Sequence, residues 1–181
     1  ALSHVEKQPD SVRARLQRTL NDLGASPSPR VRASLEKLVA IRFAEWNPDW
    51  TVKFLGPDMS PGLRAEYLGR ANVLCTHPLD QNTAAVLERE VTLPAGQKHR
   101  LEVTVAAHDY RDADWELRVF VDQERIGTRT IGPVEGKAQW QTLTFDLSAY
   151  AGKTVRLRLE NAPNGWAWEA GYWSTLRLIS E

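Results

Sequence analysis

Beginning at Trp50, apolar and polar residues alternate along the chain with a period of two. The pattern is clearest in HRLEVTVAAH at 99–108, where Leu101 and Val103 alternate with polar neighbours, and in TVRLRLE at 154–160. Successive side chains of a β-strand point to opposite faces, so the alternation predicts strands with one buried and one wet face. We expect strands near residues 50–55, 69–76, 83–93, 100–108, 115–122, 124–131, 139–147, 154–160 and 172–179. Short strands joined by turn residues predict a mainly β fold, an antiparallel jelly roll or sandwich.

The first 46 residues have helical spacing instead. Leu16, Leu20 and Leu23 recur at three- and four-residue intervals after Ser11, and a second apolar stripe follows the break SPSP at 26–29. The pattern predicts an N-terminal α-helical hairpin over residues 1–46, ahead of a β-sandwich binding module over residues 47–181. Two amphipathic helices cannot bury both stripes alone, so we expect them to pack on the sandwich or on other domains of a longer chain.

Charge and cysteine content exclude several classes of function. Lys+Arg and Asp+Glu each number 23, with no basic stripe, so we expect no nucleic-acid partner. No stretch approaches the ~20 apolar residues of a membrane helix, so we expect no membrane partner. A single cysteine, Cys75, excludes an intrachain disulfide and is expected to be a small buried residue on a strand. Because the chain begins with Ala1 rather than Met, we expect a mature secreted chain or an excised piece of a longer one.

Four segments carry a resemblance to a known family. They are AAVLEREVTLPAGQKHRLEVTVA, DADWELRVFVDQERI, WQTLTFDLSAYAGKTVRLRLEN and WAWEAGYWSTLRL. Over residues 65–180 the chain resembles the galactose-binding-like β-sandwich family, in the form found as accessory modules of large secreted bacterial proteins. The resemblance implies a jelly roll, an extracytoplasmic location at the cell surface, in the periplasm or outside the cell, and a binding module. Many members bind carbohydrate through loops at one end. It does not supply a ligand, because those loops vary between members.

Strand succession predicts which loops lie together. If each strand reverses the one before it, loops alternate between the two ends of the sandwich. One end receives the tight turns at 94–99, 122–124 and 147–153. The other receives longer loops rich in polar and aromatic residues, at 77–82, 108–114, 132–139 and 161–171. This asymmetry is typical of a scaffold with one working end.

Sugar recognition needs a flat apolar surface for C–H groups and planar hydrogen-bond partners for vicinal hydroxyls. Trp166 and Trp168 lie two residues apart, so in an extended segment they would project to the same side and form a platform. Amide, carboxylate and guanidinium side chains present paired donors or acceptors. The candidate carbohydrate-binding residues are Trp166, Trp168, Asn161, Asn164, Glu169, His108, Arg111, Asp112, Asp114, His77 and Asp80.

The tryptophans also have structural interpretations. At least one of Trp166 and Trp168 is expected to plug the open end of the sandwich while another faces outward. Trp173 is expected to anchor the last strand, and Trp115 and Trp140, which open strands, to pack between the sheets.

The acidic turn HDYRDAD, residues 108–114, has two further interpretations. Its aspartates can cap their own backbone in a solvated turn. Alternatively, Asp109, Asp112 and Asp114 contribute oxygens to a structural calcium site, although the spacing lacks the glycine and closing glutamate of a recognised calcium loop. We expect no cofactor.

No nucleophile elbow, phosphate-cradling loop or HExxH motif occurs, so we expect no enzyme activity. The favoured hypothesis is a non-catalytic carbohydrate-binding module with a polysaccharide or oligosaccharide partner, held by aromatic stacking and polar hydrogen bonds. The alternative is a structural or protein-protein interaction domain of a larger multidomain protein.

Overall fold

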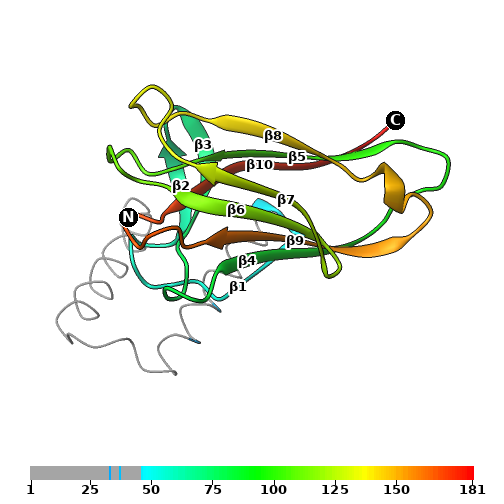
Figure 1. Ribbon diagram of the computed structural model, residues 1–181, viewed down its shortest axis with the longest axis horizontal. Helices are drawn as coiled ribbons and strands as arrows, with labels where there is room; N and C mark the ends of the chain where they lie inside the picture. The colour runs from blue at the N-terminus through cyan, green and yellow to red at the C-terminus, as the bar shows by residue number, and fades with distance from the viewer. Residues whose placement is uncertain (1–32, 34–36, 38–45) are drawn as a thin grey trace, which may run out of the picture. The chain divides into compact units, whose positions relative to one another are not determined.

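The computed structural model describes residues 33, 37 and 46–181 (Figure 1). Within that part, ten β-strands form two antiparallel sheets, which confirms the mainly β sandwich. The helical hairpin predicted over residues 1–46 lies almost entirely outside the described residues. In the described part, no helix has the length and apolar character needed to cross a membrane.

Each sheet has five strands. The first has the order β1-β4-β9-β6-β7 and the second β2-β3-β10-β5-β8. The strands are β1 (Thr51–Lys53), β2 (Gly62–Tyr67), β3 (Arg70–Thr76), β4 (Ala85–Thr92), β5 (His99–Ala106), β6 (Trp115–Val121), β7 (Glu124–Ile131), β8 (Gln141–Asp146), β9 (Thr154–Ala162) and β10 (Gly171–Ser180). A single-turn 3-10 helix, η1 (Ser148–Tyr150), follows β8. All nine strands predicted from the alternation are present.

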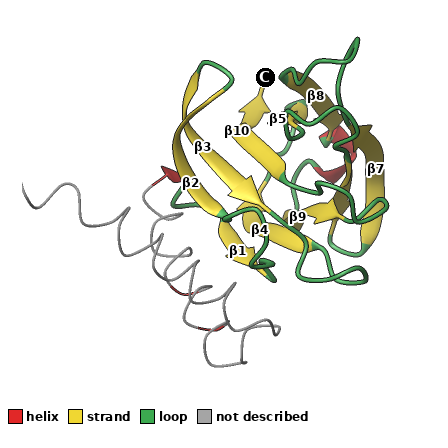
Figure 2. Cartoon of the chain, turned by 90° about the vertical axis from the view of Figure 1, so that its left-hand side faces the viewer, coloured by secondary structure: helices red, strands yellow, loops and turns green. Residues whose placement is uncertain are grey.

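The two sheets face each other across one core (Figure 2). Alternate residues of each strand enter it: on β9, Leu157 and Leu159 are fully buried between more exposed neighbours. Trp115, the first residue of β6, and Trp173, the third residue of β10, are also fully buried, and their ring centroids are 5.1 Å apart. These two indoles fill one end of the core, as expected for both residues.

Strand β2 is the one that the alternation missed. Its burial does not alternate cleanly, and it lies at the edge of its sheet. It pairs with β3 across the two-residue turn Leu68–Gly69, in which both residues have positive φ (45° and 71°). Two positive φ values match the twist of a tight hairpin, so Gly69 was the available sequence signal.

A second, smaller cluster lies on the outer face of the second sheet. Val73, Cys75 and Tyr172 point away from the main core, and Tyr67 stacks on Tyr172 with centroids 3.7 Å apart. Cys75 is buried there, as expected for a strand cysteine.

Trp140 joins this outer cluster, so the expectation that it packs between the sheets is wrong. Its ring meets the edge of Tyr67 at 6.1 Å, and its Nε1 donates to the carbonyl of Leu68 at 3.1 Å. Trp140 precedes β8, so strand alternation does not direct its side chain into the core.

The predicted distribution of loops between the two ends is confirmed. The register pairs Thr76 with Gly171, Ala106 with Tyr172, and Ala85 with Asn161, which brings the β3–β4, β5–β6 and β9–β10 loops to one end. The β7–β8 loop joins them, because Trp115 opposes Ile131. The connection from β1 to β2, residues 54–61, reaches the same end, where the N–H of Gly56 bonds the carbonyl of His77 at 2.9 Å. Figure 2 views this loop end directly.

Candidate functional site

The loop between β9 and β10, residues 163–170, closes around a buried carboxylate. The two oxygens of Glu169 accept backbone N–H groups of Asn164, at 3.0 Å, and Trp166, at 2.6 Å. Burial raises the pKa of Glu169 above its usual range, although these hydrogen bonds favour the ionised form. Glu169 was a candidate sugar contact, but here it is fully buried and holds the shape of the loop.

Asn161 is structural in the same way. Its Nδ2 donates to the carbonyl of Glu169 at 3.0 Å and to Thr76, at 3.2 Å for the carbonyl and 3.0 Å for Oγ1. Trp173 Nε1 donates to the same Thr76 Oγ1 at 2.8 Å. These buried bonds fasten the ends of β9 and β10 to β3, and they place Asn161 beneath the loop rather than at its surface.

The two loop tryptophans do not form a shared platform. Trp166 and Trp168 have φ of 69° and 61°, so the segment is not extended and the expectation drawn from an extended segment fails. Trp166 is half-buried and meets the edge of His77, with centroids 5.2 Å apart at 79°. Trp168 faces solvent and is 46% exposed. Neither indole fills the main core.

The exposed aromatic surface comes from two loops. Tyr110, 49% exposed, lies with its centroid 4.0 Å from that of Trp168, and it stacks on His108 at 4.6 Å and 12°. We call Trp168, Tyr110 and His108 the aromatic platform. Tyr110 was not among the candidates, although its position inside the predicted working loop HDYRDAD was a usable signal.

His108 lies beneath Tyr110 and beside the carboxylate of Asp109. Burial lowers its pKa, although the carboxylate of Asp109 lies 2.8 Å from Nδ1 and opposes the shift. The same Nδ1 accepts the N–H of Tyr110, at 3.2 Å, when it is unprotonated, and donates to Asp109 when it is protonated. The imidazole therefore serves as a stacking surface beneath Tyr110.

Polar groups lie beside the platform. Asn164 Nδ2 donates to Asp114 Oδ2 at 3.1 Å, which links the β5–β6 and β9–β10 loops. Arg111 and Asp112 are exposed, and within the described part of the chain no hydrogen bond or ion pair occupies their side chains. These four candidates therefore lie at the surface of the working loops.

His77 and Asp80 shape the β3–β4 loop instead. His77 is buried, its Nδ1 lies 2.9 Å from the carbonyl of Pro78, and burial lowers its pKa. The carboxylate of Asp80 accepts the N–H of Asn82 at 2.9 Å, a turn of the kind that Asp commonly makes. His77 contacts the candidate Trp166, with ring centroids 5.2 Å apart.

The aspartates of the acidic turn, residues 108–114, are also the candidate calcium ligands. In the part of the chain that the structure describes, no three His, Cys, Asp or Glu side chains are grouped closely enough to hold a metal ion. Calcium binding by Asp109, Asp112 and Asp114 stays a prediction. The arrangement at the loop end offers ring faces and planar polar groups to a ligand.

The strand order confirms the expected antiparallel β-sandwich, and the resemblance to the galactose-binding-like family is supported at the level of the fold. No family model matches the chain, and no curated protein matches its sequence.

Several solved structures resemble the chain in fold. The K3 cleaved adhesin domain of Lys-gingipain from Porphyromonas gingivalis has a TM-score of 0.53 at 13% identity, over 72% of this chain and 91% of that domain. The C-terminal CBM6 of laminarinase LamC from Zobellia galactanivorans has a TM-score of 0.45 at 9% identity, over 71% and 90%. A Stig cyclase from Fischerella has a TM-score of 0.47 at 18% identity, over 73% and 74%. At these identities the likeness concerns the fold alone.

Proposed function

We propose that the chain is a non-catalytic carbohydrate-binding module whose ligand stacks on Trp168 and Tyr110. The observation that carries the proposal is this exposed ring pair, with centroids 4.0 Å apart, at the end where the longer loops meet. Aromatic faces accept the C–H surface of a pyranose ring, and large exposed side chains clustered at a loop end are typical of a binding surface.

The polar rim would supply orientation. Asp114 and Asn164 already share one hydrogen bond, which leaves further lone pairs and amide hydrogens for vicinal hydroxyls. Arg111 and Asp112 lie on the same loop as Tyr110 and add a planar donor and a planar acceptor. We infer a neutral sugar chain as ligand, since the rim carries both signs of charge.

Binding rather than catalysis agrees with how the titratable groups are used. Both oxygens of Glu169 accept backbone N–H groups, and Nδ1 of His108 accepts the N–H of Tyr110. A general acid or base needs its proton-transfer atom within reach of the substrate. We place the module outside the cytoplasm, attached to or part of a larger protein that it holds near a polysaccharide.

Affinity electrophoresis through a panel of soluble polysaccharides tests the proposal. We expect at least one glycan to retard the wild type, and Trp168→Ala to weaken that binding by about 2 kcal/mol, or roughly thirtyfold. Tyr150→Ala is the matched control, because Tyr150 lies at the opposite end and bonds Glu124. Circular dichroism would show that each variant folds.

No retardation by any glycan would instead favour the alternative, a structural or protein-interaction domain. The likeness to adhesin domains makes a protein partner the second candidate. Concentration-dependent sedimentation of the wild type would then be expected.

A further inference from the structure

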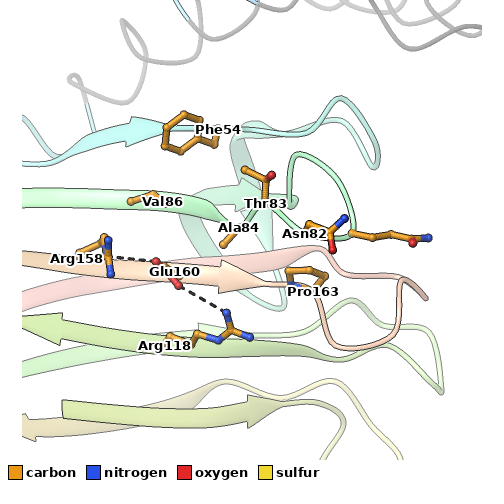
Figure 3. Close-up of a pocket in the computed structure, with 10 residues that line it drawn as sticks. Phe54, Asn82, Thr83, Ala84, Val86, Arg118, Arg158, Glu160 and Pro163 are labelled. Carbon is orange, nitrogen blue, oxygen red and sulfur yellow. Dashed lines mark ion pairs between the residues drawn. The ribbon is translucent and has the colours of Figure 1, made fainter. Parts of the chain in front are cut away.

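A groove of about 530 Å³ lies on the outer face of the first sheet, apart from the aromatic platform (Figure 3). Its floor comes from neighbouring strands: Val86 on β4, Arg158 and Glu160 on β9, and Arg118 on β6. These side chains point outward, since Leu87, Leu159 and Val119 next to them enter the core. The volume is within the range of ~300–1,000 Å³ usual for small-ligand sites.

Two guanidinium groups are fixed on this floor. Arg158 lies over the ring of Phe120 at 4.1 Å, and its Nε is 3.3 Å from Glu160 Oε1. Arg118 bonds Glu116 through Nε, and its Nη1 is 4.0 Å from Glu160 Oε2. The carboxylate of Glu160 therefore lies between the two cations, as Figure 3 shows.

The terminal nitrogens of both arginines retain donor capacity. Within the described residues the side chain of Arg158 makes no hydrogen bond, and that of Arg118 makes only the one through Nε. Two arginines and one glutamate line the groove, and Glu116, which is not part of the lining, pairs with Arg118, so the charges around the groove are of both signs. Planar, immobilised guanidinium groups match the geometry of a carboxylate.

One wall of the groove is aromatic. Phe54 follows β1, is 47% exposed and has φ of 57°, and Figure 3 shows it beyond Val86, at the side of the groove away from Arg158 and Glu160. The loop after β3 contributes Asn82 and Thr83, whose amide and hydroxyl groups complete a polar wall. An exposed ring, hydrogen-bonding side chains and two held guanidinium groups with unused terminal N–H groups together favour a sugar that carries a carboxylate.

We propose that this groove binds a uronic-acid oligosaccharide. A carboxylate of the sugar bonds the terminal nitrogens of Arg118 and Arg158, and a ring packs against Phe54. This site is separate from the aromatic platform and does not depend on what the platform binds.

Amide-resolved NMR titration tests the proposal with trigalacturonate and its fully methyl-esterified form, which differ in charge but little in shape. We expect trigalacturonate to shift amides of β4, β6 and β9 beside the groove. The ester should bind at least about tenfold more weakly, because charge-assisted hydrogen bonds are lost. Raising the salt concentration should weaken the binding of trigalacturonate but not that of its methyl ester.

Substitutions locate the site. Arg158→Gln and Arg118→Gln should each weaken trigalacturonate binding about tenfold or more. Arg156→Gln is the matched control, because Arg156 is exposed on the same face of β9 two residues away and does not line the groove. Trp168→Ala should leave this binding unchanged, which separates it from the platform.

The proposal would be overturned if trigalacturonate caused no shift, or if the acid and the ester bound with equal affinity. It would also be overturned if every arginine variant that folds bound trigalacturonate fully. Loss of binding in Trp168→Ala alone would assign the acid to the platform and also overturn it. Thermal unfolding of each variant identifies any that fails to fold. Since two arginines are tested independently, misfolding of one leaves the other decisive.

Discussion

Glu169 holds the conformation of the β9–β10 loop, on which the proposed binding surface depends. The carboxylate is buried without a basic partner, yet it bonds two backbone N–H groups that belong to the segment carrying both loop tryptophans. Positive φ at Trp166 and Trp168 disfavours this backbone for residues with a side chain, so the loop needs such an anchor. The orientation of Trp168 toward solvent thus depends on Glu169, which is fully buried.

The raised pKa of Glu169 predicts a pH-dependent term in stability. Because the folded protein holds this proton more tightly than the unfolded chain, the associated stabilisation is complete below about pH 4.5 and is lost as the pH rises through the folded-state pKa. The neutral variant Glu169→Gln lacks this term. The free energy of unfolding of the wild type, relative to Glu169→Gln, should therefore fall as the pH rises from 4 to 7. Urea denaturation at several pH values measures it, and a constant difference would show that the carboxyl is not desolvated.

At the scale of strands and loops, the ends of β3, β9 and β10 form one unit. Thr76, Asn161 and Trp173 exchange buried hydrogen bonds just beneath the β9–β10 loop. Asn161 satisfies the carbonyls of Thr76 and Glu169, neither of which can reach water there. The loop is therefore carried by the sheet rather than by its own contacts alone.

Two asparagines that the sequence could not distinguish should behave differently. Asn161→Ala removes the donor from buried acceptors and should lower the free energy of unfolding by about 3 kcal/mol. Asn164→Ala removes an exposed side chain and should change it by less than about 0.5 kcal/mol, while weakening glycan binding at the rim. Denaturant melts and affinity electrophoresis of both variants measure the contrast. Equal stability of the two would contradict the structural role of Asn161.

The alternation of apolar and polar residues predicted the strands well, because the apolar residues of a strand are the ones that point into the core. β9 is an example, with buried Val155, Leu157 and Leu159. Strand succession then placed the loops correctly at two ends. The side chains within those loops could not be predicted, since the left-handed backbone at Trp168 has no periodic signal and the inward direction of Asn161 depends on its cross-strand neighbours.

On the scale of the whole sandwich, the scaffold presents two distinct surfaces. The loop end offers aromatic faces with mixed polar groups, and the outer face of the first sheet offers a groove with two arginines on its floor. The groove could not be read from the sequence, because Arg118 and Arg158 are 40 residues apart and become neighbours only through the β9–β6 pairing. Fold likeness alone would not have located either surface, since loops and outward side chains vary on a common scaffold.

The most direct test of the central claim is to map the contact surface of whichever neutral glycan retards the chain most strongly, by amide NMR shifts at saturation. We predict that the shifts concentrate in residues 108–114 and 163–170, and that Trp168→Ala abolishes them. Shifts confined to the turns at the opposite end, residues 93–98, 122–123 and 147–153, would contradict the assignment of the aromatic platform as the glycan-binding surface.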